Sequence, residues 1–230
     1  MAYANGPRIV TDGLVCFWDA SNNKSYPGTG STWYNIANNT VNLTKSGSPT
    51  HGVYAGTSCW RFTADGQYFT GTGMSAVTNG SNLTIEAILY PETDITSGDR
   101  ATIVVTQFGS GGFYHSLNKS NRKISNYWYG KNPTGYHETG EALANNNWYY
   151  TASVWNATDG KLYQYLNTTK TSITTTGTGG YIQNTINIGR ESSARQYAGA
   201  ISLIRIYNTP LTESQILQNY NALKGRYGLS

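Results

Sequence analysis

The chain is poor in charged side chains, and this excludes several classes of protein. Asp, Glu, Lys and Arg make up 12% of the 230 residues, about half of the roughly 25% typical of soluble domains. The 16 Lys and Arg residues only slightly outnumber the 12 Asp and Glu residues, and they are scattered along the chain. A nucleic-acid-binding domain carries a clustered basic patch, so we expect no nucleic-acid partner.

Long apolar runs and paired cysteines are also missing. No run approaches the ~20 apolar residues of a membrane-spanning helix. The first seven residues contain no basic region followed by an apolar one, so we expect no signal peptide. The two cysteines, Cys16 and Cys59, lie in separate apolar stretches without a C-x-x-C motif. We expect two buried thiols, with a disulfide between them as the alternative.

Alternation of apolar and polar residues predicts a chain built of strands. The stretch Leu83–Tyr90 alternates with period two and ends at a proline. Similar patterns occur at nine other places: 14–19, 58–62, 101–108, 113–117, 123–129, 148–155, 162–166, 185–188 and 200–207. In the last of these the alternation slips between Ile201 and Ile204, which predicts a β-bulge. Ten short strands separated by glycine-containing turns predict a β-sandwich, and we assign Trp33 and Trp148 to its core.

One helix is predicted near the end of the chain. Thr212 and Gln215 are spaced as in a capping box, and apolar residues from Ile216 to Leu223 follow at helical spacing. Gly225 predicts the end of this helix. We therefore expect a helix over about residues 212–224 that packs on the sandwich. No repeat or linker divides the chain, so residues 1–230 are predicted to form a single domain.

Three segments share a pattern with one known family of β-sandwiches. Leu83–Pro91 resembles the family strand LTIEAWVYP, Trp148–Asn167 resembles the hairpin W…VAVTYDG…LKLYVNG, and Ile186–Asn208 resembles LTIGR…GYIDEVRIYNRAL. These are features of laminin G-like, concanavalin A-like proteins. The resemblance implies an all-β fold: a concanavalin A-like jelly-roll β-sandwich of two antiparallel sheets with a short C-terminal α-helix.

The two ends of the chain resemble one particular group within this family. The opening stretch Ile9–Tyr34 and the closing stretch Leu211–Tyr227 are similar to laminin G-like proteins encoded by tailed bacteriophages. Such proteins are virion components, made in the host cytoplasm and exposed on the head or tail. The resemblance implies a non-enzymatic structural protein that decorates the capsid or the tail, with other virion proteins as partners and oligomerisation left open. Partner contacts are expected at Lys224, Arg226 and Tyr227, with an ordinary polar end of the domain as the alternative.

The carboxylates give little support for catalysis. Glucanases of this superfold carry two glutamates around an aspartate at alternating positions of one strand, where the pair can act as nucleophile and acid. The nearest match starts at Glu92 and Asp94, but Thr96 stands in place of the final carboxylate. Glu138 and Glu141 fall in a stretch that we expect to be a solvated loop. We therefore predict that the protein is not an enzyme, with a glycoside hydrolase or lyase as an alternative.

No residue pattern points to a cofactor. The three histidines have no metal-ligand spacing: His51, His115 and His137. Relatives of this fold often hold Ca²⁺ with carboxylates and carbonyls, and three aspartates occur in predicted turns: Asp65, Asp94 and Asp99. Aspartate is also an ordinary turn residue. We expect no metal and no cofactor, with Ca²⁺ as the alternative.

Carbohydrate is the most specific ligand that the sequence suggests. Sugars bind through C–H faces stacked on aromatic rings and through hydrogen bonds to amides and carboxylates. We expect a host-surface glycan to bind at Trp128, Tyr129, Asn132 and Tyr136, where a strand ends in a loop. Aromatic residues fall on both faces of this strand, so some must be exposed or lie at an interface. The alternatives are that these rings cover the sandwich or pack between subunits, and that the protein is a carbohydrate-binding module outside any virion.

Overall fold

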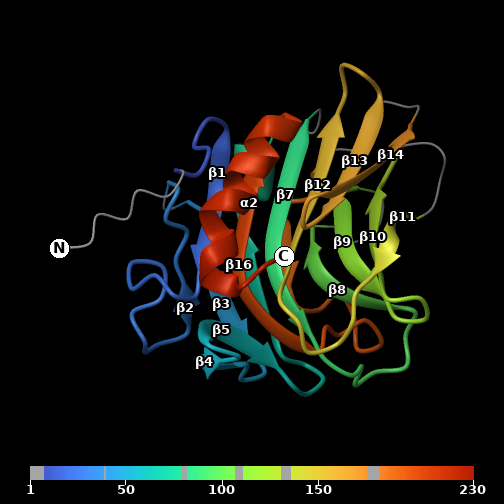
Figure 1. The fold of residues 1–230 in the computed structure, drawn as a ribbon. Helices are drawn as coiled ribbons and strands as arrows, with labels where there is room; N and C mark the ends of the chain where they lie inside the picture. Colours follow the sequence, from blue (N-terminus) through green and yellow to red (C-terminus); the bar gives the residue numbers. More distant parts are fainter. Residues whose placement is uncertain (1–7, 39, 79–81, 107–110, 131–135, 176–181) are drawn as a thin grey trace.

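The computed structural model describes residues 8–38, 40–78, 82–106, 111–130, 136–175 and 182–230. These residues form two antiparallel sheets packed face to face, with a long helix on the outside of one of them (Figure 1). The predicted jelly-roll sandwich with a C-terminal helix is therefore confirmed. No helix in the described ranges is long and apolar enough to cross a membrane.

The first sheet has the strand order β14-β13-β12-β7-β16-β5-β4, and β1 also pairs with β16. Its strands have these bounds: β1 Leu14–Asp19, β4 Thr50–Tyr54, β5 Thr57–Phe62, β7 Leu83–Pro91, β12 Tyr149–Asn156, β13 Lys161–Leu166, β14 Thr169–Thr174 and β16 Gly199–Tyr207. The register of β16 against β7 shifts between Ile201 and Leu203, which confirms the predicted bulge. Strands β14 and β4 lie at the two ends of this order, and Val53 of β4 is 76% exposed.

The second sheet has the order β11-β10-β9-β8-β15-β6-β3-β2. Its strands have these bounds: β2 Thr32–Trp33, β3 Leu43–Ser46, β6 Tyr68–Thr72, β8 Arg100–Val105, β9 Phe113–Asn118, β10 Lys123–Trp128, β11 His137–Ala142 and β15 Thr185–Ile188. A one-turn helix, α1 (Met74–Val77), follows β6. All ten predicted strands are present, although residues 107 and 108 of the one predicted over 101–108 lie outside the described residues. The described ranges hold six further strands that were not predicted: β2, β3, β4, β6, β11 and β14.

Apolar side chains from both sheets fill the space between them. Trp18, Trp33, Trp60 and Phe69 are fully buried there. The two cysteines are buried free thiols, as predicted. Burial raises the pKa of the Cys59 thiol to about 12, and a thiol that stays protonated is a poor nucleophile.

Helix α2 (Glu213–Tyr227) covers part of the outer face of the first sheet. The predicted capping box is present: Gln215 N donates to Thr212 Oγ1 (3.3 Å) and Thr212 N donates to Gln215 Oε1 (2.8 Å). The predicted end is wrong, because Gly225 is helical and Gly228 adopts the left-handed conformation (φ 61°) that ends the helix. The extra turn places Tyr227 against the sheet, where it is buried.

A buried ion pair lies beneath this helix. Glu86 of β7 and Arg205 of β16 are both fully buried, with Arg205 Nε 3.1 Å from Glu86 Oε2. The carboxylate also accepts hydrogen bonds from Asn219 Nδ2 of α2 (2.8 Å) and from the hydroxyl of Tyr150. The Arg205 guanidinium lies 5.6 Å from the ring centre of Phe17. The Glu86 carboxylate thus connects β7 to β16 by an ion pair, and to β12 and α2 by hydrogen bonds, inside the protein.

Candidate functional site

Tyrosine side chains gather on the outer face of the second sheet. Tyr114 of β9 and Tyr127 of β10 are cross-strand partners, with ring centres 6.1 Å apart. Tyr136, which precedes β11, lies 5.5 Å from Tyr127 and 6.1 Å from Tyr114. Tyr129 extends the group, 6.4 Å from Tyr127. We call these four residues the tyrosine cluster. Tyr114 is buried, and the other three are half-buried. The cluster therefore forms a partly exposed aromatic surface that lies on the buried Tyr114 ring.

Two arginines hold Tyr136 in place. The Arg100 guanidinium of β8 lies 4.3 Å from the ring centre of Tyr136, a cation–π geometry. Arg195, from the segment between β15 and β16, donates through Nη1 to the Tyr136 hydroxyl (3.3 Å). From the same segment, Glu191 accepts a hydrogen bond from the Tyr114 hydroxyl (3.2 Å). Residues far apart in the chain therefore meet at one surface.

The carboxylates of this surface are all bonded to cations or amides. Asp99 lies 3.2 Å from Arg195 Nε and 3.4 Å from Arg100. Glu138 of β11 lies 3.7 Å from Arg100 and accepts a hydrogen bond from Asn118 Nδ2 (2.5 Å). Burial alone would raise the pKa of Glu138, but these hydrogen bonds and the nearby guanidinium outweigh it and lower the pKa. Glu138 therefore stays ionised at neutral pH.

Two phenols of the cluster, those of Tyr114 and Tyr136, stay neutral. Burial raises the pKa of the Tyr114 hydroxyl, and the charge of Glu191 adds to this effect. Burial also raises the pKa of the Tyr136 hydroxyl. A tyrosine in this state combines an apolar ring with a hydroxyl that can donate or accept a hydrogen bond. The surface can therefore hold a ligand that has both apolar and hydroxyl-bearing faces.

The structure corrects part of the predicted sugar site. Tyr129 and Tyr136 lie in the tyrosine cluster, whereas Asn132 lies outside the described residues. Trp128 points inward and is only 7% exposed. It packs on Phe113 and Trp155, with ring centres 5.9 Å away in each case. Because side chains alternate along a strand, it is the two neighbouring tyrosines, not Trp128, that face outward.

The predicted partner contacts are also corrected in part. Tyr227 is buried, and its hydroxyl lies 3.0 Å from the Ser202 hydroxyl. Arg226 forms two hydrogen bonds to Asp19, of 2.8 and 2.6 Å. Both residues therefore fix the end of α2 to the body of the protein. Lys224 and Arg226 are exposed, and their contact with a partner stays a prediction.

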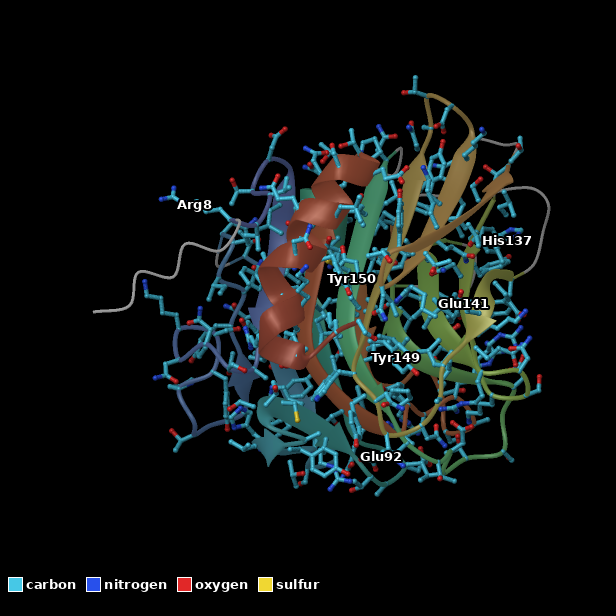
Figure 2. All side chains as sticks on the ribbon, viewed as in Figure 1. Arg8, Glu92, His137, Glu141, Tyr149 and Tyr150 are labelled. Carbon is cyan, nitrogen blue, oxygen red and sulfur yellow. The ribbon has the colours of Figure 1, made fainter. Side chains whose placement is uncertain are left out.

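The residues considered for catalysis and for Ca²⁺ have other partners. Glu92 forms an ion pair with Arg61. The three turn aspartates each pair with arginine: Asp65 with Arg190, Asp94 with Arg122, and Asp99 with Arg100 and Arg195. The predicted loop around Glu138 and Glu141 is in fact strand β11 (Figure 2). Within the described parts of the chain, no three His, Cys, Asp or Glu residues are grouped as metal ligands would be.

A polar cluster lies inside the sandwich, behind the tyrosines. His115 of β9 is fully buried, and its Nδ1 lies 2.7 Å from Asn126 Oδ1 and 3.1 Å from Ser153 Oγ. Its Nε2 lies 3.0 Å from Thr151 Oγ1. Asn126 belongs to the second sheet, and Thr151 and Ser153 belong to the first. His115 therefore connects the two sheets through hydrogen bonds in an otherwise apolar core.

Comparison with known proteins identifies the family. The family model described as Concanavalin A-like lectin/glucanases superfamily matches residues 62–217. The match covers more than half of the chain, and the chain therefore belongs to this superfamily. A sequence search of curated proteins finds no match.

Solved structures show the same fold at low sequence identity. Trypanosoma rangeli sialidase, bound to the inhibitor DANA, has a TM-score of 0.67 and 17% identity, over 96% of this chain and 34% of that chain. A second structure is that of botulinum neurotoxin type C, a toxin whose cell entry is described as dependent on interaction with two ganglioside molecules. Its TM-score is 0.71 at 12% identity, over 93% of this chain and 52% of that chain. The binding domain of botulinum neurotoxin DC, in complex with rat synaptotagmin II, has a TM-score of 0.69 and 13% identity, also over 93% and 52%. The chain spans about a third to a half of these proteins.

Proposed function

We propose that this protein binds uncharged glycans without cleaving them, as a surface-exposed component of a bacteriophage virion. The observation that carries the binding proposal is the tyrosine cluster, in which three half-buried rings lie together on the outer face of the second sheet and one of them, Tyr136, is held by two arginines. A pyranose has a C–H face that can stack on such rings and hydroxyls that can bond to their polar edges. The sialidase and the ganglioside-dependent neurotoxin that share the fold support a carbohydrate ligand.

The charges around the cluster favour a neutral sugar. Arg100 and Arg195 are each within ion-pair distance of two carboxylates. A guanidinium that already has carboxylate partners has little remaining attraction for an acidic ligand. Its outward N–H groups can still donate to sugar hydroxyls. We therefore expect neutral hexoses or N-acetylhexosamines to bind better than sialic or uronic acids.

Two features support binding without catalysis. A glycosidase needs one carboxyl group that stays protonated near neutral pH to act as the acid. Glu138 has the opposite property, because its hydrogen bonds to Asn118 and Asn121 and the nearby Arg100 lower its pKa. Glu191 and Asp99 are held in contacts with Arg195. Incubation with polysaccharides is expected to release no reducing ends.

Replacing Tyr127 by alanine is expected to weaken glycan binding about tenfold or more, since it removes the central ring of the cluster. Binding would be measured on an array of neutral and acidic glycans and then by titration of the strongest ligand. Tyr127→Phe keeps the ring and should bind within about threefold of the wild type. Tyr34→Ala is the matched control, because Tyr34 is 41% exposed and lies outside the cluster. The proposal fails if the wild type binds no glycan, or if Tyr127→Ala binds as well as the wild type.

The virion assignment rests on the similarity of both ends of the chain to phage laminin G-like proteins. These two ends meet in the fold: Val10 N donates to Asn219 Oδ1 (2.8 Å), and Gln218 Nε2 donates to the carbonyl of Arg8 (2.6 Å). The prediction is that purified particles contain the protein in a fixed number of copies, measured by quantitative mass spectrometry. Detection of the protein in infected cells but not in particles would refute the virion role. The alternative, a carbohydrate-binding module that is not part of a virion, would then remain.

A further inference from the structure

A second aromatic surface lies on the opposite sheet, beyond the end of helix α2. The helix covers the part of the first sheet around Tyr150, whereas Glu92 lies at the far end of that sheet (Figure 2). Tyr54 of β4, Tyr90 of β7 and Trp148, which precedes β12, form a continuous row there. The ring centres are 5.4 Å apart between Tyr54 and Tyr90, and 5.2 Å apart between Tyr90 and Trp148. All three side chains are half-buried, so the assignment of Trp148 to the core is wrong. We call these residues the aromatic row.

An ion pair borders one end of the row. Arg61 of β5 binds Glu92 through two hydrogen bonds of 2.8 and 2.9 Å. The Arg61 guanidinium also lies 3.9 Å from the ring centre of Tyr54. The two charged side chains are 31% and 20% exposed, so their outer edges can still bond to a ligand. An open hollow of about 200 Å³, lined in part by Tyr54 and Arg61, adjoins the row.

Trp148, at one end of the row, is held by two contacts of its own. The Trp148 indole donates through Nε1 to the carbonyl of Ala55 (3.1 Å). Its other side packs against Tyr227 of α2, with ring centres 5.4 Å apart. Rings that are fixed before binding lose little conformational freedom when a ligand stacks on them. The contacts that fix Trp148 do not use Tyr54 or Tyr90, whose rings extend the row toward the ion pair.

We infer that the aromatic row is a second glycan-binding site, in which a pyranose stacks on the Tyr90 ring, contacts the Tyr54 ring that stands at 86° to it, and bonds to Arg61 and Glu92. The pair is electrically balanced, so the ligand class is a neutral sugar bearing adjacent hydroxyls that can meet a guanidinium and a carboxylate together. This inference extends the proposed glycan binding but uses none of the residues of the tyrosine cluster. Because the two sites face away from each other on opposite sheets, one molecule can bind two separate glycan chains.

The test compares four proteins on one printed array of neutral and acidic glycans: wild type, Tyr127→Ala, Tyr90→Ala and the double variant. We expect Tyr90→Ala to lose about tenfold or more in affinity for a group of glycans that Tyr127→Ala still binds. The double variant should bind neither group. Tyr90→Phe should retain binding, and Tyr34→Ala again serves as the control. Thermal unfolding of each variant checks that it is folded, and Tyr54→Ala replaces Tyr90→Ala if the latter does not fold.

The outcomes separate the two sites. If Tyr90→Ala and Tyr54→Ala bind every glycan within about twofold of the wild type, the second site is refuted while the tyrosine cluster stands. If Tyr90→Ala removes all binding and Tyr127→Ala removes none, the aromatic row stands and the tyrosine cluster is refuted. A wild-type protein that binds nothing on the array refutes both.

Discussion

Glu86→Gln is expected to lower the free energy of unfolding by about 3–5 kcal/mol, the usual cost of breaking a buried ion pair. The substitution leaves the Arg205 guanidinium fully buried, with its positive charge no longer balanced. The ring of Phe17 remains beside it, but a ring compensates a buried charge only weakly. For a chain of this size the loss corresponds to a fall of roughly 10 °C in Tm. Urea unfolding followed by circular dichroism would measure it.

Two further variants separate the ion pair from simple loss of packing. Arg205→Met should cost less than Glu86→Gln, because Glu86 keeps its hydrogen bonds from Asn219 and Tyr150. The double variant Glu86→Gln/Arg205→Met should be more stable than Glu86→Gln alone, since it contains no uncompensated charge. Glu213→Gln is the surface control: it breaks the exposed pair with Lys170 and should cost less than about 1 kcal/mol. A similar small cost for Glu86→Gln would contradict the prediction.

Acid is expected to destabilise the protein through His115. Burial lowers the pKa of this imidazole from 6.5 to about 4 in the folded state, against a smaller opposing effect of its hydrogen bond to Asn126. Between pH 6.5 and 4 the unfolded chain therefore binds a proton that the folded chain does not. Stability is fully present above pH 6.5 and falls as the pH drops through this window. The loss should reach about 2–3 kcal/mol near pH 4.5.

Unfolding in urea at several pH values between 7 and 4.5 would test this expectation. His115→Gln removes the titrating group, so the variant should lose about 2 kcal/mol less than the wild type over this range, although it is less stable at pH 7. Keeping the measurements at or above pH 4.5 limits the contribution of Glu138, whose hydrogen bonds are lost only at lower pH because its pKa is lowered. Equal losses in the two proteins would show that His115 does not carry the effect. An NMR titration of the imidazole gives an independent check.

Local sequence patterns were sufficient to predict the parts of the fold that depend on the alternation of apolar and polar residues and on helix capping. The bulge at Ile201–Leu203 and the start of α2 at Thr212 were both predicted, because each depends on neighbouring residues only. The unpredicted strands are short or lie toward the sheet edges, where few side chains reach the core. In β14, for example, Ile173 is the one residue that packs against the core. Such strands are defined by their partners, and the partners are distant in sequence.

The candidate site was predictable in position but not in orientation. Aromatic residues on both faces of β10 marked the region, but the pattern alone could not show which face is buried. The sheet packs Trp128 inward against Trp155 of the other sheet, and Tyr127 therefore faces outward. Arg195 and Glu191 approach the cluster from a segment more than 50 residues away in the chain, and no local signal identifies them. The same holds for Tyr54 and Trp148, which both pack on Tyr90.

The two edges of the first sheet differ in how they would respond to a neighbouring molecule. In the described part of the chain, β4 has a strand partner on one side only, and its Val53 is 76% exposed. A bare edge of this kind can add a strand from another protein, whereas charged side chains on an edge discourage such pairing. At the opposite edge, β14 carries Lys170. Two copies joined through their β4 edges would therefore form a closed pair, and a fibre would not extend from it.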